Sequence, residues 1–168
     1  MKVKSDQKNS KSCIICGMEN PLGVKASFYN MEDGSVATVF KFRFEHQSYT
    51  GRVHGGMITA LLDELIGRAI WVTEPETYGV TTTISITFRK PVPYDTPLKG
   101  RAYITFNSKR GFTAKGEIFS MDGILLAEGE GKYLKLPAKM ISAGVDMDEE
   151  MCYKPLPVEQ IDLPPIKK

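Results

Sequence analysis

Apolar residues recur every three or four positions over residues 53–71, which is the spacing of a helix that buries one face. The members of this stripe are Ile58, Leu61, Leu62, Leu65, Ile66, Ala69 and Ile70. A second stripe of the same helix carries Gly56, Ala60, Asp63 and Gly67, so that one carboxylate projects among minimal side chains. The pattern predicts one mostly buried helix on which another backbone or a ligand can approach Asp63.

Alternating apolar and polar residues predict strands on both sides of this helix. Over residues 80–88 apolar residues alternate with Thr and Ser, which predicts one apolar face and one hydroxyl face. Further strands are predicted over residues 24–29, 36–44, 101–106, 112–119 and 124–134. The last two are joined by Asp122-Gly123, a strong hairpin signal, and small residues repeat on their faces, leaving room for a helix. Periodicity alone supports an α+β domain with an antiparallel sheet around a central helix.

Composition agrees with a single globular domain. The chain has 168 residues, a hydrophobic share of 42% and a net charge of +2, which is too small to argue for nucleic acid binding. Residues 1–12 form a polar segment without the apolar core of a secretion signal, and no run approaches the length of a membrane span. We expect a cytoplasmic protein with a polar tail (1–12), one domain (13–136) and a Pro-rich, acidic extension (137–168).

The two adjacent acids of the helix have different surroundings. Glu64 has Arg68 four residues later, in the favourable order for a helical pair, which predicts an ion pair on the surface. Asp63 has no basic residue three or four positions away on either side. A functional carboxylate is therefore favoured at Asp63, and a buried tertiary hydrogen bond is the alternative.

Gly55 and Gly56 fall in the first helical turn, whose backbone N–H groups lack partners within the helix. Without side chains, these donors can reach a polarised oxygen. Gly56 and Asp63 are seven residues apart, which is about 10 Å along a helix, whereas a reacting carbonyl needs its oxyanion donor and its base each within about 3 Å. If both residues act, two copies of the helix must face each other, which predicts a two-fold dimer.

The residues His54-Gly55-Gly56 followed by Leu61-Leu62-Asp63-Glu64 resemble the hotdog-fold thioesterases, specifically the PaaI-like branch of the 4-hydroxybenzoyl-CoA thioesterase superfamily. Residues 79–92, 107–111 and 122–129 resemble later segments of that family, so the resemblance spans about 13–136. It implies a hotdog fold with a six-stranded antiparallel sheet wrapped around a long central helix. It also implies an acyl-CoA thioesterase that works as an obligate homodimer or as a dimer of dimers, with no cofactor beyond the coenzyme A of its substrate.

The catalytic roles that we expect follow from the chemistry of thioester hydrolysis. The Gly56 N–H, alone or together with that of Gly55, would stabilise the oxyanion, and Asp63 of the other subunit would deprotonate water or attack directly. The resemblance further places the hydroxyl of Thr81 beside the water and gives His54 a supporting role at the helix entrance. Several relatives have Asn six residues before the histidine, whereas this chain has Ser48.

Four basic residues, Arg89, Lys90, Lys109 and Arg110, lie at predicted strand ends where the family often binds the coenzyme A moiety. Lys and Arg suit phosphate, although each of these side chains can equally be only solvated. Cys13 and Cys16 have the spacing of half a zinc site, but no second pair follows, so we expect a structural turn and no metal.

Two other functions remain open from the sequence. Ser48 in place of Asn leaves open a non-catalytic acyl-CoA-binding or regulatory protein. A hotdog enoyl- or hydroxyacyl-thioester dehydratase or hydratase would need a histidine paired with a carboxylate, and His46 and His54 are the only histidines.

Overall fold

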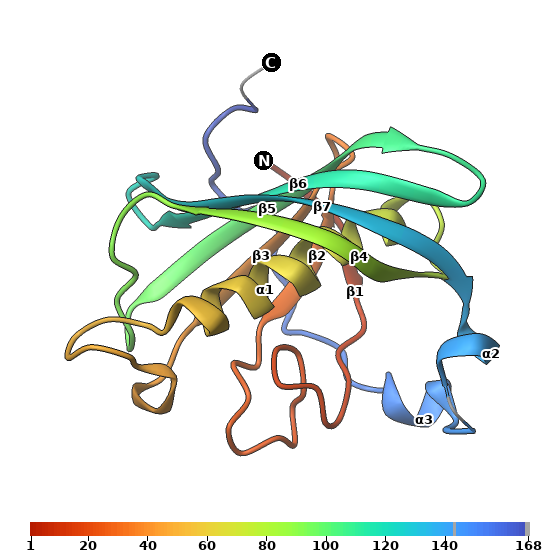
Figure 1. Ribbon diagram of the computed structural model, residues 1–168, viewed down its shortest axis with the longest axis horizontal. Coiled ribbons are helices and arrows are strands. Elements are labelled where there is room, and N and C mark those ends of the chain that lie inside the picture. Colours follow the sequence, from red (N-terminus) through yellow and green to blue (C-terminus); the bar gives the residue numbers. More distant parts are fainter. Residues whose placement is uncertain (143, 167–168) are drawn as a thin grey trace.

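The computed structural model describes residues 1–142 and 144–166 of the chain. Within these residues, one antiparallel sheet of seven strands has the spatial order β1-β2-β3-β5-β6-β7-β4 (Figure 1). The strands are β1 (Val3–Gln7), β2 (Ser27–Met31), β3 (Val36–Lys41), β4 (Thr77–Phe88), β5 (Pro97–Asn107), β6 (Gly111–Ser120) and β7 (Leu125–Pro137). Strand β4 directly follows the helix in sequence but forms one edge of the sheet.

The central helix α1 (Gly55–Gly67) continues into a 3₁₀ turn, η2 (Arg68–Val72), and packs against one face of the sheet (Figure 1). Its buried face consists of Ile58, Leu61, Leu62, Leu65 and Ile66, as the apolar spacing predicts. Glycines let the helix lie close: a Cβ at Gly116 would lie 2.6 Å from Cγ1 of Ile66. A Cβ at Gly100 would similarly lie 2.9 Å from Cδ2 of Leu65. The α+β class with a sheet around a central helix is confirmed.

The sheet has one strand more than the six expected. The extra strand is β1, which comes from the segment expected to be a polar tail and pairs with β2. An edge strand can carry polar side chains because most of them face solvent, and only Gln7 of β1 is buried. The strand predicted over residues 24–29 begins later than expected. Lys25 has a left-handed φ of 58°, which an extended strand does not allow, so β2 begins only at Ser27.

The C-terminal extension packs on the domain. It contains two single-turn helices, α2 (Ala138–Ile141) and α3 (Met147–Glu150), and backbone pairing then joins it to the N-terminal segment at Asn9 and Lys2. Ile161 and Leu163 complete a second hydrophobic cluster, with Tyr29, Met31, Ala37 and Phe119. Phe28 belongs to the helix-facing cluster and its neighbour Tyr29 to the second one, which places the two clusters on opposite faces of the sheet.

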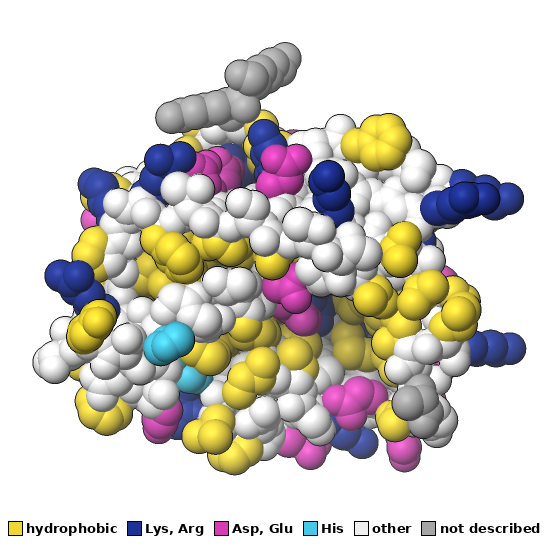
Figure 2. All heavy atoms as spheres, viewed as in Figure 1, with side chains coloured by type: hydrophobic (Ala, Val, Ile, Leu, Met, Phe, Trp, Pro, Cys, Tyr) yellow, Lys and Arg dark blue, Asp and Glu magenta, His cyan; other side chains and the backbone are white. Residues whose placement is uncertain are grey.

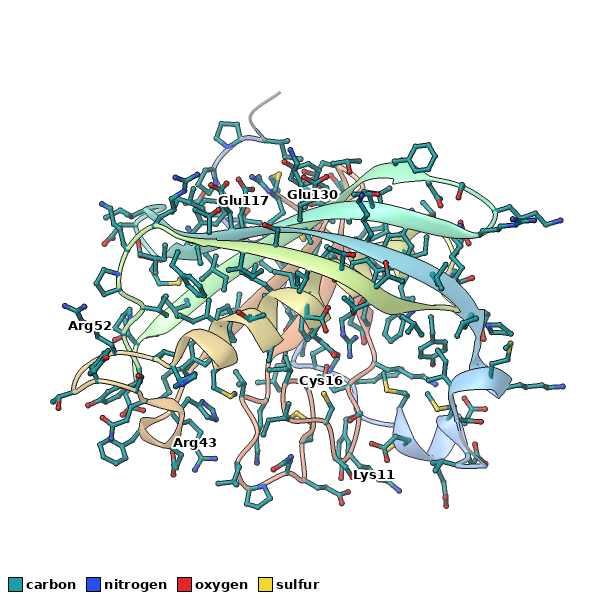
Figure 3. The ribbon with its side chains drawn as sticks, viewed as in Figure 1. Lys11, Cys16, Arg43, Arg52, Glu117 and Glu130 are labelled. Carbon is teal, nitrogen blue, oxygen red and sulfur yellow. The ribbon has the colours of Figure 1, made fainter. Side chains whose placement is uncertain are left out.

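The face away from α1 also carries charge. Glu117 and Glu130 project from it (Figure 3), and Glu117 forms an ion pair with the buried Arg101. The Arg101 guanidinium also donates to the carbonyl oxygen of Pro164 in the C-terminal extension. Among the described residues, no helix has the length and apolar character that crossing a membrane would require.

Candidate functional site

The carboxylate of Asp63 is held by two hydroxyl groups. Thr81 Oγ1 donates to Asp63 Oδ1 over 2.7 Å, and Tyr133 Oη donates to the same oxygen over 3.0 Å. Tyr133 Oη also lies 3.2 Å from the backbone oxygen of Asp63. In the described chain both hydrogen bonds to this carboxylate end on Oδ1, so the second oxygen, Oδ2, is left for a water molecule or a ligand.

The register of the sheet brings the two hydroxyls together. Thr81 on β4 is the direct partner of Tyr133 on β7, and partners directly opposite in antiparallel strands project on the same face. The register shifts between Thr81 and Thr83, so Thr82 is an extra, bulged residue. A bulge re-aims the neighbouring side chains, and here it follows the residue that reaches Asp63.

Tyr133 is a site residue that the sequence analysis missed. Its ring stacks on Phe112 with centroids 4.9 Å apart and planes 7° apart. Glycines enclose the ring: a Cβ at Gly131 would lie 2.5 Å from Cε2, and one at Gly67 would lie 3.3 Å from Cε1. Burial and the charge of Asp63 raise the pKa of the Tyr133 phenol, which keeps it protonated as a donor. The clustering of glycines on facing elements was the one signal available in the sequence.

The N-terminus of α1 is capped by His54. Its Nδ1 accepts a hydrogen bond of 2.8 Å from the Gly56 N–H, and its backbone has the extended conformation typical of an N-cap (φ −63°, ψ 135°). The Gly56 N–H, expected as the first oxyanion donor, is therefore already used within the chain. Among the described residues, the Gly55 N–H makes no such bond, so Gly55 is the better candidate donor.

These two parts of the site lie at different places along the helix. Gly55 and Asp63 are eight residues apart in α1, which corresponds to roughly 12 Å of helix rise. Ser48 lies with the helix entrance, on an exposed loop closed by a hydrogen bond of 2.8 Å from its own N–H to the Arg52 oxygen. Arg52 marks that loop in Figure 3. The protomer thus brings Thr81 to Asp63 but leaves Ser48, His54 and the glycines apart from them.

The four basic residues expected at coenzyme A divide into two pairs. Arg89 and Lys90 follow β4 and are exposed, with Arg89 in an ion pair to Glu128. Lys109 and Arg110 form the β5–β6 turn, which lies beside the beginning of β4. Because β4 has twelve residues, the two pairs are separated by roughly 35 Å of strand. One protomer does not bring all four together.

Asp63, Thr81 and Tyr133 line a cavity of about 420 Å³ beside the C-terminal half of α1. Its apolar wall includes Trp71 and Tyr78 together with Met147 and Met151 of the C-terminal extension. The same four residues also line an adjoining cavity of about 600 Å³. Figure 2 shows acidic side chains beside a hollow with hydrophobic walls on this face.

Glu64 and Arg68 form the ion pair that the sequence predicts, with Arg68 Nε donating to Glu64 Oε1 over 2.8 Å. The predicted surface location is wrong, because the Arg68 side chain is only 4% exposed. The guanidinium lies between the rings of Phe28 and Trp71, at 4.3 and 4.6 Å from their centroids. Aromatic faces stabilise a buried cation and account for its place in the core.

Cys13 and Cys16 line the same cavity as Asp63. A hydrogen bond from the Cys16 thiol lowers the pKa of Cys13 to about 7, and the same hydrogen bond and burial raise the pKa of Cys16. Both sulfur atoms and a carboxylate oxygen of Glu64 lie within 4.8 Å of one another. Within the described residues, this is the one group of such side chains with the spacing of metal ligands.

Comparison with known proteins places this site in context. A family model described as the thioesterase superfamily matches residues 50–127, which include α1, β4, β5 and β6. Human acyl-coenzyme A thioesterase 13 is 28% identical over 112 residues, which cover 66% of this chain and 79% of the human protein.

Solved structures also resemble this chain. The crystal structure of RHA08564, a thioesterase superfamily protein, matches with a TM-score of 0.67 at 28% identity, over 73% of this chain. The match spans 63% of that protein, so less than two thirds of its length is represented here. The Escherichia coli PaaI protein from the phenylacetic acid degradation operon matches with a TM-score of 0.61 at 18% identity, covering 67% of this chain and 80% of that one, which shows a shared fold.

Proposed function

We propose that this chain, which belongs to the hotdog-fold thioesterase superfamily, hydrolyses the thioester bond of an acyl- or aryl-CoA. Its α+β hotdog fold is confirmed by the structural match. The observation that carries the proposal is the Asp63 carboxylate, held at Oδ1 by Thr81 and Tyr133 beside an apolar cavity. The human relative is named as an acyl-coenzyme A thioesterase, which supports the same substrate class.

The active unit in this proposal is a homodimer with two shared sites. Gly55 and Asp63 are too far apart along one helix for one protomer to present both to a thioester carbonyl. Two features of the protomer suit a partner: α1 exposes Gly56 on its small-residue stripe, and β4 is an edge strand with exposed Thr and Ser side chains. An edge strand is a template for pairing with a second copy. A dimer of dimers is compatible with the same contact.

The proposed chemistry uses the Gly55 N–H of one subunit and the Asp63 carboxylate of the other. The carbonyl oxygen of the thioester accepts a hydrogen bond from the N–H of Gly55 of the partner subunit, at the positive end of that helix. Asp63 takes a proton from water, and the resulting hydroxide attacks the carbonyl carbon. Collapse of the tetrahedral intermediate breaks the C–S bond, and the coenzyme A sulfur takes the proton back from Asp63.

We favour the base over the nucleophile for Asp63 because Oδ1 is tied to both β4 and β7. A carboxylate anchored by two donors can accept a proton at Oδ2 without moving. A single turnover in ¹⁸O-water tests the choice: a base places ¹⁸O in the released acid, whereas an anhydride that water attacks at the Asp63 carbonyl carbon releases an unlabelled acid and labels Asp63. Label in Asp63 would therefore overturn the base.

The remaining predicted residues take supporting roles. His54 orients the helix entrance, since its Nδ1 holds the Gly56 N–H. Ser48, on the loop that precedes it, would approach Asp63 only across the dimer interface. Lys90, Lys109 and Arg110 are exposed and available to the phosphates of coenzyme A, and Arg89 must share its charge with Glu128.

In this arrangement the acyl group of the substrate enters an apolar cavity. Beyond Asp63, the cavity is walled by Trp71, Tyr78 and the methionines of the C-terminal extension. Methionine side chains adapt their shape to an apolar ligand. We propose that this extension, which follows the matched family region, forms part of the acyl pocket.

A panel of acyl- and aryl-CoAs with detection of free thiol tests the function. We expect hydrolysis by the natural chain and its loss in Asp63→Asn. Asp122→Asn is the matched control, because it makes the same change on an exposed carboxylate in the β6–β7 turn. Binding of acyl-CoA without turnover would instead support the non-catalytic module.

The structure disfavours the dehydratase alternative. His46 is buried, with Nδ1 accepting from the Arg43 N–H and Nε2 bonded to the Leu22 oxygen. The Nδ1 of His54 is engaged by Gly56. Among the described residues of the protomer, neither histidine is paired with a carboxylate as this chemistry requires.

A further inference from the structure

Two sulfurs and one carboxylate converge where the N-terminal loop meets the central helix. Cys13 and Cys16 come from the loop between β1 and β2, and Glu64 comes from α1, next to Asp63 in sequence. Their ligand atoms lie within 4.8 Å of one another, and Cys13 Sγ is 3.9 Å from Glu64 Oε2. Figure 3 shows Cys16 close to the C-terminal end of α1.

The turn that carries the cysteines is fixed by its own hydrogen bonds. The Ile15 N–H points at Cys13 Sγ over 3.3 Å, the Cys13 N–H bonds Ser10 Oγ over 2.9 Å, and the Gly17 N–H bonds the Cys13 oxygen over 2.8 Å. A Cβ at position 17 would lie 2.2 Å from the Cys13 oxygen, so the turn requires glycine there. The backbone of the turn and the sulfur of Cys13 are therefore held in place within the chain.

The two oxygens of Glu64 have different partners. Oε1 accepts from Arg68 Nε, which leaves Oε2 as the oxygen on the cysteine side. A carboxylate beside two sulfurs disfavours thiolates unless a cation is present. The charges of two thiolates, Glu64, Arg68 and one divalent cation sum to zero.

Arg68 supplies an independent sign that an anion belongs here. Its side chain is 4% exposed, and Nη2 is a buried donor without a hydrogen-bond partner among the described residues. The Cys16 side chain is beside this guanidinium. Orphaned buried donors are rare, and a metal-bound Cys16 thiolate would provide the missing acceptor while being stabilised by it.

We propose that Cys13, Cys16 and Glu64 bind one Zn²⁺ ion, with a fourth position open to the cavity that contains Asp63. Thiolate and carboxylate ligands in tetrahedral geometry suit zinc. The observed separations are close to those between ligands about 2.0–2.3 Å from a common ion. The ion links the N-terminal loop to α1 and thereby fixes the wall of the cavity beside Asp63.

A redox-active dithiol is the competing use of the same cysteines. The lowered pKa of Cys13 would suit an attacking thiolate, but a dithiol has no need of the Glu64 carboxylate that lies beside the two sulfurs. A disulfide between Cys13 and Cys16 would also leave both Glu64 Oε2 and Arg68 Nη2 without a new partner.

Titration of the full, reduced, chelator-treated chain with Co²⁺ and then Zn²⁺ tests the proposal independently of hydrolysis. We expect sulfur-to-cobalt charge-transfer absorption and tetrahedral d–d bands that saturate at one equivalent and disappear on addition of Zn²⁺. Zn²⁺ should also raise the melting temperature, since it binds the folded state.

Cys13→Ser and Glu64→Gln should each weaken Zn²⁺ binding by roughly 100-fold or more. Loss of a residue that only supports a ligand typically weakens binding by about 10- to 100-fold, and loss of a direct ligand should cost more. Cys152→Ser is the matched control, because Cys152 is exposed and outside the cluster, and it should bind as the natural chain does. Circular dichroism and urea unfolding of each variant separate lost ligation from lost folding.

Two results would overturn the site. One is the absence of charge-transfer absorption in the reduced natural chain. The other is binding that Cys13→Ser and Glu64→Gln leave intact while both remain folded. A Cys13–Cys16 disulfide formed under mild peroxide, in a chain with no Co²⁺ affinity, would assign the pair to redox chemistry.

Discussion

The phenolic hydroxyl of Tyr133 and the hydroxyl of Thr81 meet on one oxygen of Asp63, so the strand β7 and the strand β4 both hold the helix carboxylate. Tyr133 does not need to touch the substrate to matter. It acts as a positioning residue, because it fixes where the free oxygen of Asp63 points.

Tyr133→Phe should lower kcat by about 10- to 150-fold, the equivalent of about 1.5–3 kcal/mol for one hydrogen bond to a charged group. KM should change little, and the fold should persist because the ring can still stack on Phe112. Steady-state kinetics measure the split. Tyr103→Phe is the control, because it removes a hydroxyl from a partly buried tyrosine of β5. If Tyr133→Phe changes KM as much as kcat, Tyr133 is not only a positioning residue.

Thr81→Val removes the second donor while keeping a β-branched side chain that suits a strand. We expect a fall in kcat of similar size, because Thr81 makes the shorter of the two bonds to Asp63 Oδ1. Thr83→Val, two residues along on the same strand, should be neutral. Equal activity of the two variants would remove Thr81 from the site.

His54 variants separate capping from catalysis. His54→Ala should lower the free energy of unfolding by about 1 kcal/mol, the usual cost of losing an N-cap. His54→Asn should restore most of that stability, because Asn is among the best N-caps. If His54 only orients the helix entrance, His54→Asn should also retain most of kcat/KM, and its inactivation despite normal stability would point to a direct role.

Mixing two inactive variants tests the shared site. Gly55→Pro removes the proposed donor at the first helical position, where proline fits, and the extended backbone of His54 suits a following proline. Each variant alone should be inactive, since losing one oxyanion donor costs about 100- to 1,000-fold. Refolded together with Asp63→Asn at equal amounts, the mixture should regain about a quarter of natural activity, because half of the dimers carry one intact site.

Size-exclusion chromatography with light scattering supports that experiment by giving the mass of each species. If verified mixed dimers remain inactive, Gly55 of one subunit and Asp63 of the other do not form one shared site. A monomeric natural chain with full activity would end the shared-site model.

The reactivity of Cys13 should depend on pH in a defined direction. Hydrogen bonding lowers its pKa to about 7, so its thiolate fraction rises as pH increases through 7. In chelator-treated Cys152→Ser protein, the rate of alkylation by iodoacetamide should therefore rise between pH 6 and pH 8 (about one pH unit either side of this pKa) and then level off. Peptide mapping should place the label on Cys13, and a rate still rising steeply at higher pH would contradict the lowered pKa.

The sequence by itself predicted the elements that repeat locally. The spacing of Leu61, Leu62, Leu65 and Ile66 defined the buried face of α1, and the alternation along residues 80–88 defined β4. Asp63 stood out because it had no local partner. The family resemblance led from these residues to the thioesterase class, and the family model and structural match support it.

Only the tertiary structure decided which groups meet. Tyr133 lies 70 residues from Asp63 in the chain, and strand register with a bulge at Thr82 sets their contact. Side-chain capping by His54 moved the candidate donor from Gly56 to Gly55, and the fold buried Arg68 and brought Glu64 to the cysteines. Periodicity reports which face of an element is apolar, whereas pairing across the sheet and loop closure depend on contacts distant in sequence, which no local pattern encodes.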